Sequence, residues 1–224
     1  MADIKEEKGF VLMELFTSQG CSSCPPADVI LGQYAKKNDA HIIPLAFHVD
    51  YWNRLGWVDS FSTEEYTSRQ HYYASKFNSE SVYTPQIILN GQKEMVGSDE
   101  AAIATAVGNF LNEPETASIS FSSKSVEGNA VKIGYSVNKL ISTARINAAL
   151  VQADVITQIR AGENRGVKLD NYNVVREFKT VSLTNTAGNI ELQLPRGTNT
   201  NEFSVVLFIQ DDSGKIIAAI KTSL

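Results

Sequence analysis

Reactive side chains are few in this sequence and are confined to its first half. The 224 residues include two cysteines, two tryptophans and three histidines, none of them beyond residue 84. A structural zinc site uses about four Cys or His ligands, and the histidines show no metal-ligand spacing, so we expect no metal or cofactor site. No apolar run of about 18 residues is present, which predicts no transmembrane segment. We expect the first half to perform the chemistry and the second half to support it.

Basic charge is also scarce. The formal net charge is −5, with 8 basic and 15 acidic residues up to Glu113 and 12 basic and 10 acidic residues after it. Neither half has the basic stripe that nucleic-acid binding requires, so we exclude nucleic acid as a partner. The first ten residues, MADIKEEKGF, are charged and give no sign of a signal peptide.

The first half alternates strand and helix patterns. Strands are predicted at 10–17, 41–49, 86–90 and 93–96. Helices are predicted after Pro25-Pro26, which suit a first helical turn, and after the capping residues Ser62 and Ser98. The order β-α-β-α-β-β-α predicts an α/β layer fold closed by one hairpin.

Beyond a linker at 112–115, apolar residues alternate with a period of two and no helical segment is visible. Seven or so short strands are predicted, with turns at Gly128-Asn129, Gly188-Asn189 and 212–214. This pattern is typical of an antiparallel β-sandwich. We therefore predict two domains, an α/β domain over 1–113 and an all-β, sandwich-like domain over 114–224.

The two cysteines form a CxxC motif, Cys21-Ser22-Ser23-Cys24, between a predicted strand and a predicted helix. The amide groups and the positive dipole end of a helix N-terminus favour a thiolate and lower the cysteine pKa from about 8.5. We expect Cys21 to be the exposed, attacking thiol and Cys24 to resolve the mixed disulfide. Inert core cysteines, a structural disulfide and half of a zinc site are the alternatives, and this spacing at a strand-to-helix turn favours a redox pair.

Two segments, VLMELFTSQGCSSC and VYTPQIILNG, resemble the active-site strand and the cis-proline segment of the thioredoxin superfamily. The resemblance implies that 1–113 is a thioredoxin-like domain. It also implies a cis bond at Thr84-Pro85, facing the dithiol, where substrate backbone would bind. A buried acid on the first strand of thioredoxins helps move the proton of the inner cysteine, and Glu14 matches that position. The alternative is that the Glu14 side chain reaches solvent or a backbone donor.

A longer set of segments resembles a largely uncharacterised bacterial family of thioredoxin-like proteins, filed under a domain of unknown function. The segments are CSSCPPAD, FHVDYWNRLGWVDSFSTEEYTSRQHYYA and GENRG with NYNVVR. Members of this family are often exported and lack an agreed substrate. The resemblance therefore favours a periplasmic or secreted location and supports the fold more than the function.

Other candidate residues lie near the predicted carboxyl edge of the sheet. His48 and Asp50 end the second strand and are candidates for a proton shuttle, although a structural, hydrogen-bonded histidine is the more common case. Trp52 belongs to an aromatic-rich loop and is a candidate substrate contact, with packing of the loop as the alternative. In the second half, Glu163, Arg165 and Arg176 belong to the family-like segments, and we expect structural ion pairs there.

These observations favour a thiol–disulfide oxidoreductase that acts on a protein partner or a small thiol. One alternative is a binding module for a protein or for a soft metal such as Cu(I), held by the two thiolates with His48 as a third ligand. Another is a structural or adhesion protein whose disulfide only braces the fold. The direction of the reaction, the substrate and the oligomeric state do not follow from the sequence.

Overall fold

The structure, a computed structural model, describes residues 8–224. The charged segment at the start of the chain lies mostly outside the described residues. Within them, three α-helices are present, α1 (Pro25–Lys37), α2 (Glu64–Lys76) and α3 (Glu100–Leu111). None of these described helices has the length and apolar character needed to cross a bilayer. Side chains of Thr63 and Asp99 cap α2 and α3, one residue later than predicted in each case.

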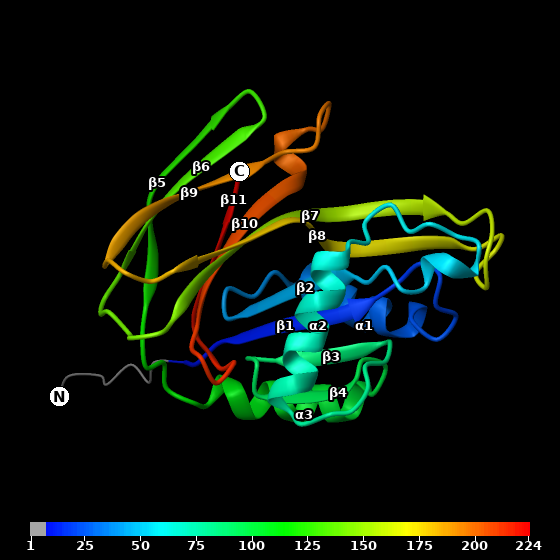
Figure 1. The fold of residues 1–224 in the computed structure, drawn as a ribbon, viewed down its shortest axis with the longest axis horizontal. Coiled ribbons are helices and arrows are strands. Elements are labelled where there is room, and N and C mark those ends of the chain that lie inside the picture. The colour runs from blue at the N-terminus through cyan, green and yellow to red at the C-terminus, as the bar shows by residue number, and fades with distance from the viewer. Residues whose placement is uncertain (1–7) are drawn as a thin grey trace.

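The described strands form two sheets (Figure 1). The larger sheet has eight strands in the order β11-β10-β7-β8-β2-β1-β3-β4, and the smaller has the order β5-β6-β9. The first-half strands are β1 (Val11–Thr17), β2 (Ile42–His48), β3 (Gln86–Leu89) and β4 (Lys93–Val96). The second-half strands are β5 (Ile119–Glu127), β6 (Ala130–Val137), β7 (Arg145–Gln158), β8 (Lys168–Ser182), β9 (Ala187–Gln193), β10 (Phe203–Gln210) and β11 (Ile216–Ser223). Short 3₁₀ helices lie at Asn53–Leu55 and Thr200–Glu202.

The predicted fold class, a thioredoxin-like α/β domain plus a separate all-β sandwich domain, is wrong. The element order of the first half is as predicted, and β1 pairs with β2 in parallel. However, four second-half strands continue the same sheet, because β8 lies beside β2. The protein is mostly β, with one large mixed sheet shared by both halves. The boundary between 113 and 114 as a limit of independent folding stays a prediction.

Proline in β2 explains why the two halves meet so briefly. β2 and β8 are parallel and share a single register pair, Ala46 with Val174. Pro44 has no N–H to donate, so a regular ladder cannot run the length of β2. The Asn173 side chain partly replaces the ladder, since its Nδ2 donates to Pro44 O at 2.9 Å. The β2–β8 strand pairing therefore depends on one register pair and one side chain, and the remaining contacts between the halves come from side-chain packing and loops.

The alternation of β1 assigns the helices to opposite faces of the large sheet. Met13 and Leu15 are fully buried in a cluster with residues of α1 and α3. Leu12 and Phe16 point the other way, into a cluster with aromatic residues of α2 and with β8 and β10. The dithiol helix α1 and the helix α2 consequently lie on different sides of β1 (Figure 1).

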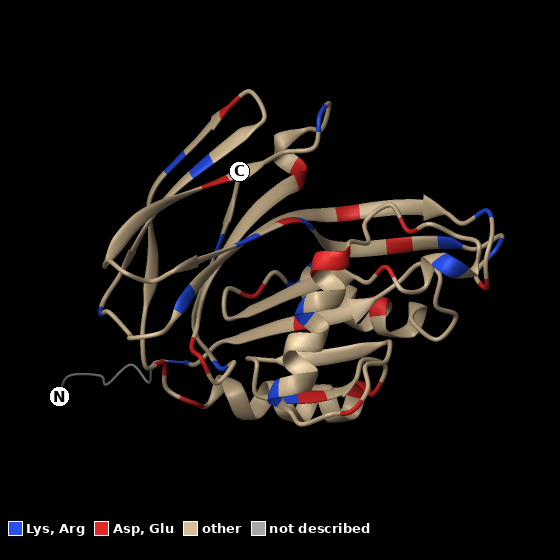
Figure 2. Cartoon of the chain, in the orientation of Figure 1, with Lys and Arg blue, Asp and Glu red and all other residues tan. Residues whose placement is uncertain are grey.

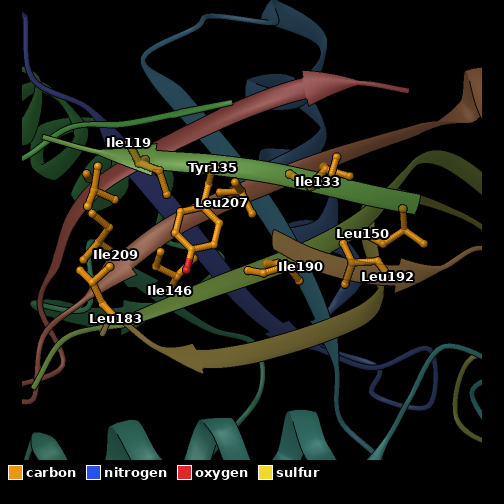
Figure 3. Close-up of a cluster of buried hydrophobic side chains, with 14 of the residues drawn as sticks. Ile119, Ile133, Tyr135, Ile146, Leu150, Leu183, Ile190, Leu192, Leu207 and Ile209 are labelled. Atoms are coloured by element: carbon orange, nitrogen blue, oxygen red, sulfur yellow. The ribbon is translucent and has the colours of Figure 1, made fainter. Parts of the chain in front are cut away.

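The second half has its own apolar core between the two sheets (Figure 3). Ile133 and Tyr135 of the small sheet meet Ile146, Leu150 and Leu207 of the large sheet. This part is sandwich-like, as predicted, although one of its layers belongs to the shared sheet. Acidic and basic residues are interspersed over the molecule in the view of Figure 2.

Candidate functional site

The cysteines lie in a tight turn between β1 and α1. Cys24 is the N-cap residue of α1, and Pro25 and Pro26 occupy its first turn. Cys21 and Cys24 form a disulfide across a Cα–Cα distance of 5.5 Å. The CxxC motif therefore stands at a helix N-terminus, where the sequence predicts it.

Cys21 is fully buried, and the prediction that it is exposed is wrong. Polar groups surround its sulfur, with Thr84 Oγ1 and Ser23 Oγ both 3.3 Å from Sγ. The two prolines carry no N–H, so the first helical turn offers fewer amide donors than an ordinary helix. The hydrogen-bonding groups found at the Cys21 sulfur are therefore the hydroxyl groups of Thr84 and Ser23, whereas the sequence predicts backbone amides there.

A loop from the second half covers the dithiol turn. The long β7–β8 hairpin, yellow in Figure 1, brings residues 159–167 to this end of the molecule. Asn164 Nδ2 lies 2.9 Å from Gln19 O and 2.9 Å from Cys21 O, and donates to both. Glu163 Oε2 accepts from Ser22 N at 3.0 Å. The turn is thus held by a segment more than a hundred residues away in sequence.

The aromatic-rich loop holds the same turn from its other side. Asp59 Oδ2 accepts from Gln19 N at 2.8 Å and lies 2.7 Å from His48 Nδ1. Trp57 Nε1 donates to Gln19 Oε1 at 3.0 Å. Trp52 Nε1 donates to Thr84 Oγ1 at 2.8 Å. The loop contributes specific hydrogen bonds in addition to apolar packing.

The predicted substrate residues Thr84, Pro85 and Trp52 come together beside Cys21. The Thr84–Pro85 peptide bond is cis, as the resemblance implies. Thr84 O accepts from Ser23 Oγ at 3.4 Å, which ties this segment to the CxxC turn. A role in substrate binding stays a prediction for all three residues.

Buried charges lie beneath the dithiol turn. Burial raises the pKa of Asp28 to about 7, although the nearby His48 lowers it. Burial lowers the pKa of His48, but the charges and hydrogen bond of Asp59 and Asp28 leave it above its ordinary value. His48 holds the Asp59 pKa below its ordinary value in spite of burial. His48 Nε2 is buried and has no hydrogen-bond partner among the residues that the structure describes.

Glu14 does not lie at the dithiol. It is fully buried on the α2 side of β1, whereas Cys24 begins α1 on the opposite side. Its carboxylate accepts from Arg69 Nε at 2.5 Å and Nη2 at 2.9 Å, and from Tyr73 OH at 2.5 Å. The structure therefore gives Glu14 a structural ion pair.

The other predicted residues are divided between the dithiol end and the rest of the fold. Asp50 Oδ1 accepts from Thr67 Oγ1 at 2.6 Å, and so Asp50 contacts α2 instead of sharing a site with His48. Arg176 donates to the amide of Gln152, and no ion pair is found for it in the described part of the chain. Within residues 8–224, no group of three or more His, Cys, Asp or Glu could hold a metal ion.

Asp28, Asp59 and Asn164 are the site residues that sequence reasoning missed. Asp28 directly follows CSSCPPA, so its place one helical turn after Cys24 was available as a signal. Asn164 lies in GENRG, where its charged neighbours give the more conspicuous signal. No local pattern marks Asp59.

A match over most of the sequence identifies the family of the chain. Residues 12–210 match the profile of a family described as "Protein of unknown function (DUF1223)". The chain belongs to the DUF1223 family. The match covers the CxxC turn, the Thr84-Pro85 segment and the loop that carries Asn164, so this DUF1223 chain has its whole candidate site inside the family region.

Solved structures support the same overall architecture. An Agrobacterium tumefaciens protein is similar to this DUF1223 chain with 29% identity and a TM-score of 0.74, covering 96% of this chain and 94% of its own. HBP35 of Porphyromonas gingivalis shares the fold at 14% identity and a TM-score of 0.59, over 97% of this chain and 76% of its own. Among curated proteins, none matches the sequence.

Proposed function

We propose that this DUF1223 protein is a thiol–disulfide oxidoreductase whose dithiol is related to that of the thioredoxin superfamily. The observation that carries the proposal is the Cys21–Cys24 disulfide at the N-terminus of α1, with the hydroxyl groups of Thr84 and Ser23 at the Cys21 sulfur. A cysteine that only braces a fold gains nothing from donors aimed at its sulfur. A nucleophilic thiolate does, because hydrogen bonds to a charged group are the stronger kind.

In the proposed reaction, the Cys21 thiolate attacks one sulfur of a substrate disulfide. A Cys21–substrate bond forms, the substrate S–S bond breaks, and the second substrate sulfur leaves as a thiolate that takes a proton from water. Cys24 then attacks Cys21, which restores the Cys21–Cys24 disulfide and releases the other substrate thiol. Two substrate sulfurs are reduced and the two protein sulfurs are oxidised. The opposite direction uses the same bonds in reverse.

We assign the proton of Cys24 to Asp28. Asp28 follows Cys24 by one helical turn, and its buried carboxyl has Thr17 and His48, at the ends of β1 and β2, as neighbours. With a pKa of about 7, the Asp28 carboxyl can take up and release a proton near neutral pH. Asp28 also lines a groove between α1 and β8, about 290 Å³ in volume, through which a proton can exchange with solvent. Glu14, on the far side of β1, does not serve this step.

Access to the dithiol requires the covering loop to move. Cys21 has no exposed surface, and the Asn164 and Glu163 contacts hold residues 159–167 over the turn. A substrate sulfur has to approach Cys21 in line with the S–S bond that it forms or breaks. We therefore place displacement of this loop before the first exchange step.

Turnover of insulin disulfides by a small dithiol, with and without the protein, tests the proposal. Wild-type protein should accelerate insulin reduction, and Cys21→Ser should abolish the acceleration. Cys24→Ser should instead trap a mixed disulfide between Cys21 and the substrate, visible by mass on a non-reducing gel. Full insulin-reducing activity in Cys21→Ser would refute the proposal.

A further inference from the structure

The Cys21 sulfur is the end of a short hydrogen-bond relay that starts at Trp52. Trp52 Nε1 lies 2.8 Å from Thr84 Oγ1, and Thr84 Oγ1 lies 3.3 Å from Cys21 Sγ. An indole N–H can only donate, so in this pair the Thr84 hydroxyl oxygen must accept. Its own proton stays free for another partner. In the disulfide the sulfur has no proton and can only accept, which leaves the Thr84 hydroxyl as the donor to it.

We propose that Trp52 is a positioning residue that orients the Thr84 hydroxyl toward Cys21 and thereby stabilises the Cys21 thiolate in the reduced enzyme. This inference rests on the proposed oxidoreductase function and adds a specific source of thiolate stability to it. It also changes the role of Trp52 and Thr84, which the sequence suggested only as contacts to substrate.

The relay matters here because the usual donors are missing. Pro25 and Pro26 remove two amide hydrogens from the first turn of α1, and the Ser22 amide is taken by Glu163. Ser23 Oγ is the other hydroxyl near the sulfur, but it also lies 3.4 Å from Thr84 O, so its single proton is divided between two acceptors. The Thr84 hydroxyl accepts from Trp52 and donates to Cys21 Sγ at 3.3 Å, with the Tyr51 hydroxyl as a further neighbour.

The redox step that depends on the relay is the reduction of the Cys21–Cys24 disulfide by an external dithiol. The S–S bond of the protein breaks, the donor's two thiols become a disulfide, and Cys21 and Cys24 receive the two electrons. Cys24 keeps one of the two donor protons as a thiol, Cys21 remains a thiolate, and the other proton goes to water. Greater stability of the thiolate favours the reduced form and makes the dithiol more oxidising.

Other titratable groups surround the turn and have to be held constant. The charged and titratable side chains near it are Glu163, Asp28, His48, Asp59 and Tyr51. Substitutions at Trp52 or Thr84 leave the contacts of the other four groups in place, but they remove side-chain hydrogen bonds that lower the Tyr51 pKa, so tyrosine absorbance has to be followed separately from thiolate absorbance. A second tryptophan of the same loop provides a matched control, since Trp57 Nε1 donates to the side chain of Gln19, which is not hydrogen-bonded to the sulfur.

The test measures the Cys21 pKa of the reduced protein from the ultraviolet absorbance of the thiolate. Thr84→Val should raise this pKa by about one unit, a roughly ten-fold loss of thiolate at a pH below it, because one donor to a charged sulfur is lost. Thr84→Ser should restore the wild-type value. Trp52→Phe should raise the pKa by a smaller amount, since the hydroxyl remains but is free to turn, and Trp57→Phe should leave it unchanged.

The reduction potential is read from equilibrium with glutathione. It should be more negative in Trp52→Phe than in wild type, and more negative still in Thr84→Val. The relay is refuted if Thr84→Val leaves both the pKa and the potential at wild-type values, or if Trp52→Phe and Trp57→Phe behave alike. If Thr84→Val does not fold, the comparison of Trp52→Phe with Trp57→Phe still tests the relay. Failure of the relay is distinguishable from failure of the function, because the latter appears as insulin reduction that persists in Cys21→Ser.

Discussion

Asp28→Asn should make the stability of the protein less sensitive to a rise in pH from about 4 to about 7. The folded-state pKa of this carboxyl is about 7, against an ordinary value of 3.8. Between these values the folded state keeps the proton and the unfolded state does not, so stability falls as pH rises through this window. A difference of about three pKa units, at about 1.4 kcal/mol per unit, corresponds to about 4 kcal/mol. The amide side chain of the variant carries no charge at any pH in the window and should escape this loss.

The assay is urea unfolding of the oxidised wild-type and Asp28→Asn proteins between pH 4 and pH 8. The free energy of unfolding of the variant, relative to wild type, should rise by about 4 kcal/mol over this range. Because His48 lowers the Asp28 pKa, the same comparison in a His48→Gln background should show the rise at higher pH. A difference between variant and wild type that is constant with pH would contradict the burial argument.

Four further substitutions test other parts of the structure. Glu14→Gln should destabilise the oxidised protein by about 3–5 kcal/mol in urea unfolding, because a buried guanidinium loses its partner, without changing the alkylation rate of the reduced dithiol; a faster or slower rate would place Glu14 in the reaction. Asn164→Ala should speed alkylation several-fold by releasing the covering loop, and an unchanged rate would show that the loop does not limit access. Gly32→Ala should cost about 1–3 kcal/mol, because a Cβ there would lie 2.3 Å from the ring of Tyr172. Gly108→Ala, on an open face of α3, should stabilise by about 0.5–1 kcal/mol, and equal effects of the two alanines would refute the packing argument.

The local parts of the site could be predicted because they depend on neighbours in sequence. The apolar run of β1, the CxxC spacing and the proline pair together indicate a strand, a turn and a helix start, and the disulfide at that turn follows from them. The hairpin between β3 and β4 has the same origin in Asn90-Gly91. Such signals need no knowledge of the remaining fold.

The shared sheet could not be predicted from local patterns. Alternation over 168–182 fits a strand of a separate sandwich as well as a strand beside β2, because side-chain period says nothing about the partner strand. The apolar run of β2 fits a buried strand in either arrangement. The junction itself consists of one register pair and the Asn173–Pro44 hydrogen bond, which no periodicity reveals.

The environment of Cys21 was hidden for a similar reason. The residues that bury the turn come from a loop more than 140 positions later, so exposure could not be judged from the CxxC segment. The choice between Glu14 and Asp28 depended on which helix covers which face of β1. Alternation places Glu14 with Leu12 and Phe16, but only the assembled fold shows that α2 covers that face.

The reduction potential of the Cys21–Cys24 pair tests the central claim most directly. Equilibration of the protein with glutathione redox buffers, followed by alkylation and mass measurement, gives the ratio of dithiol to disulfide. A redox-active pair should be poised above about −300 mV, within reach of the buffers. A pair that stays oxidised throughout, with a potential below about −300 mV, would mean that the disulfide only braces the fold.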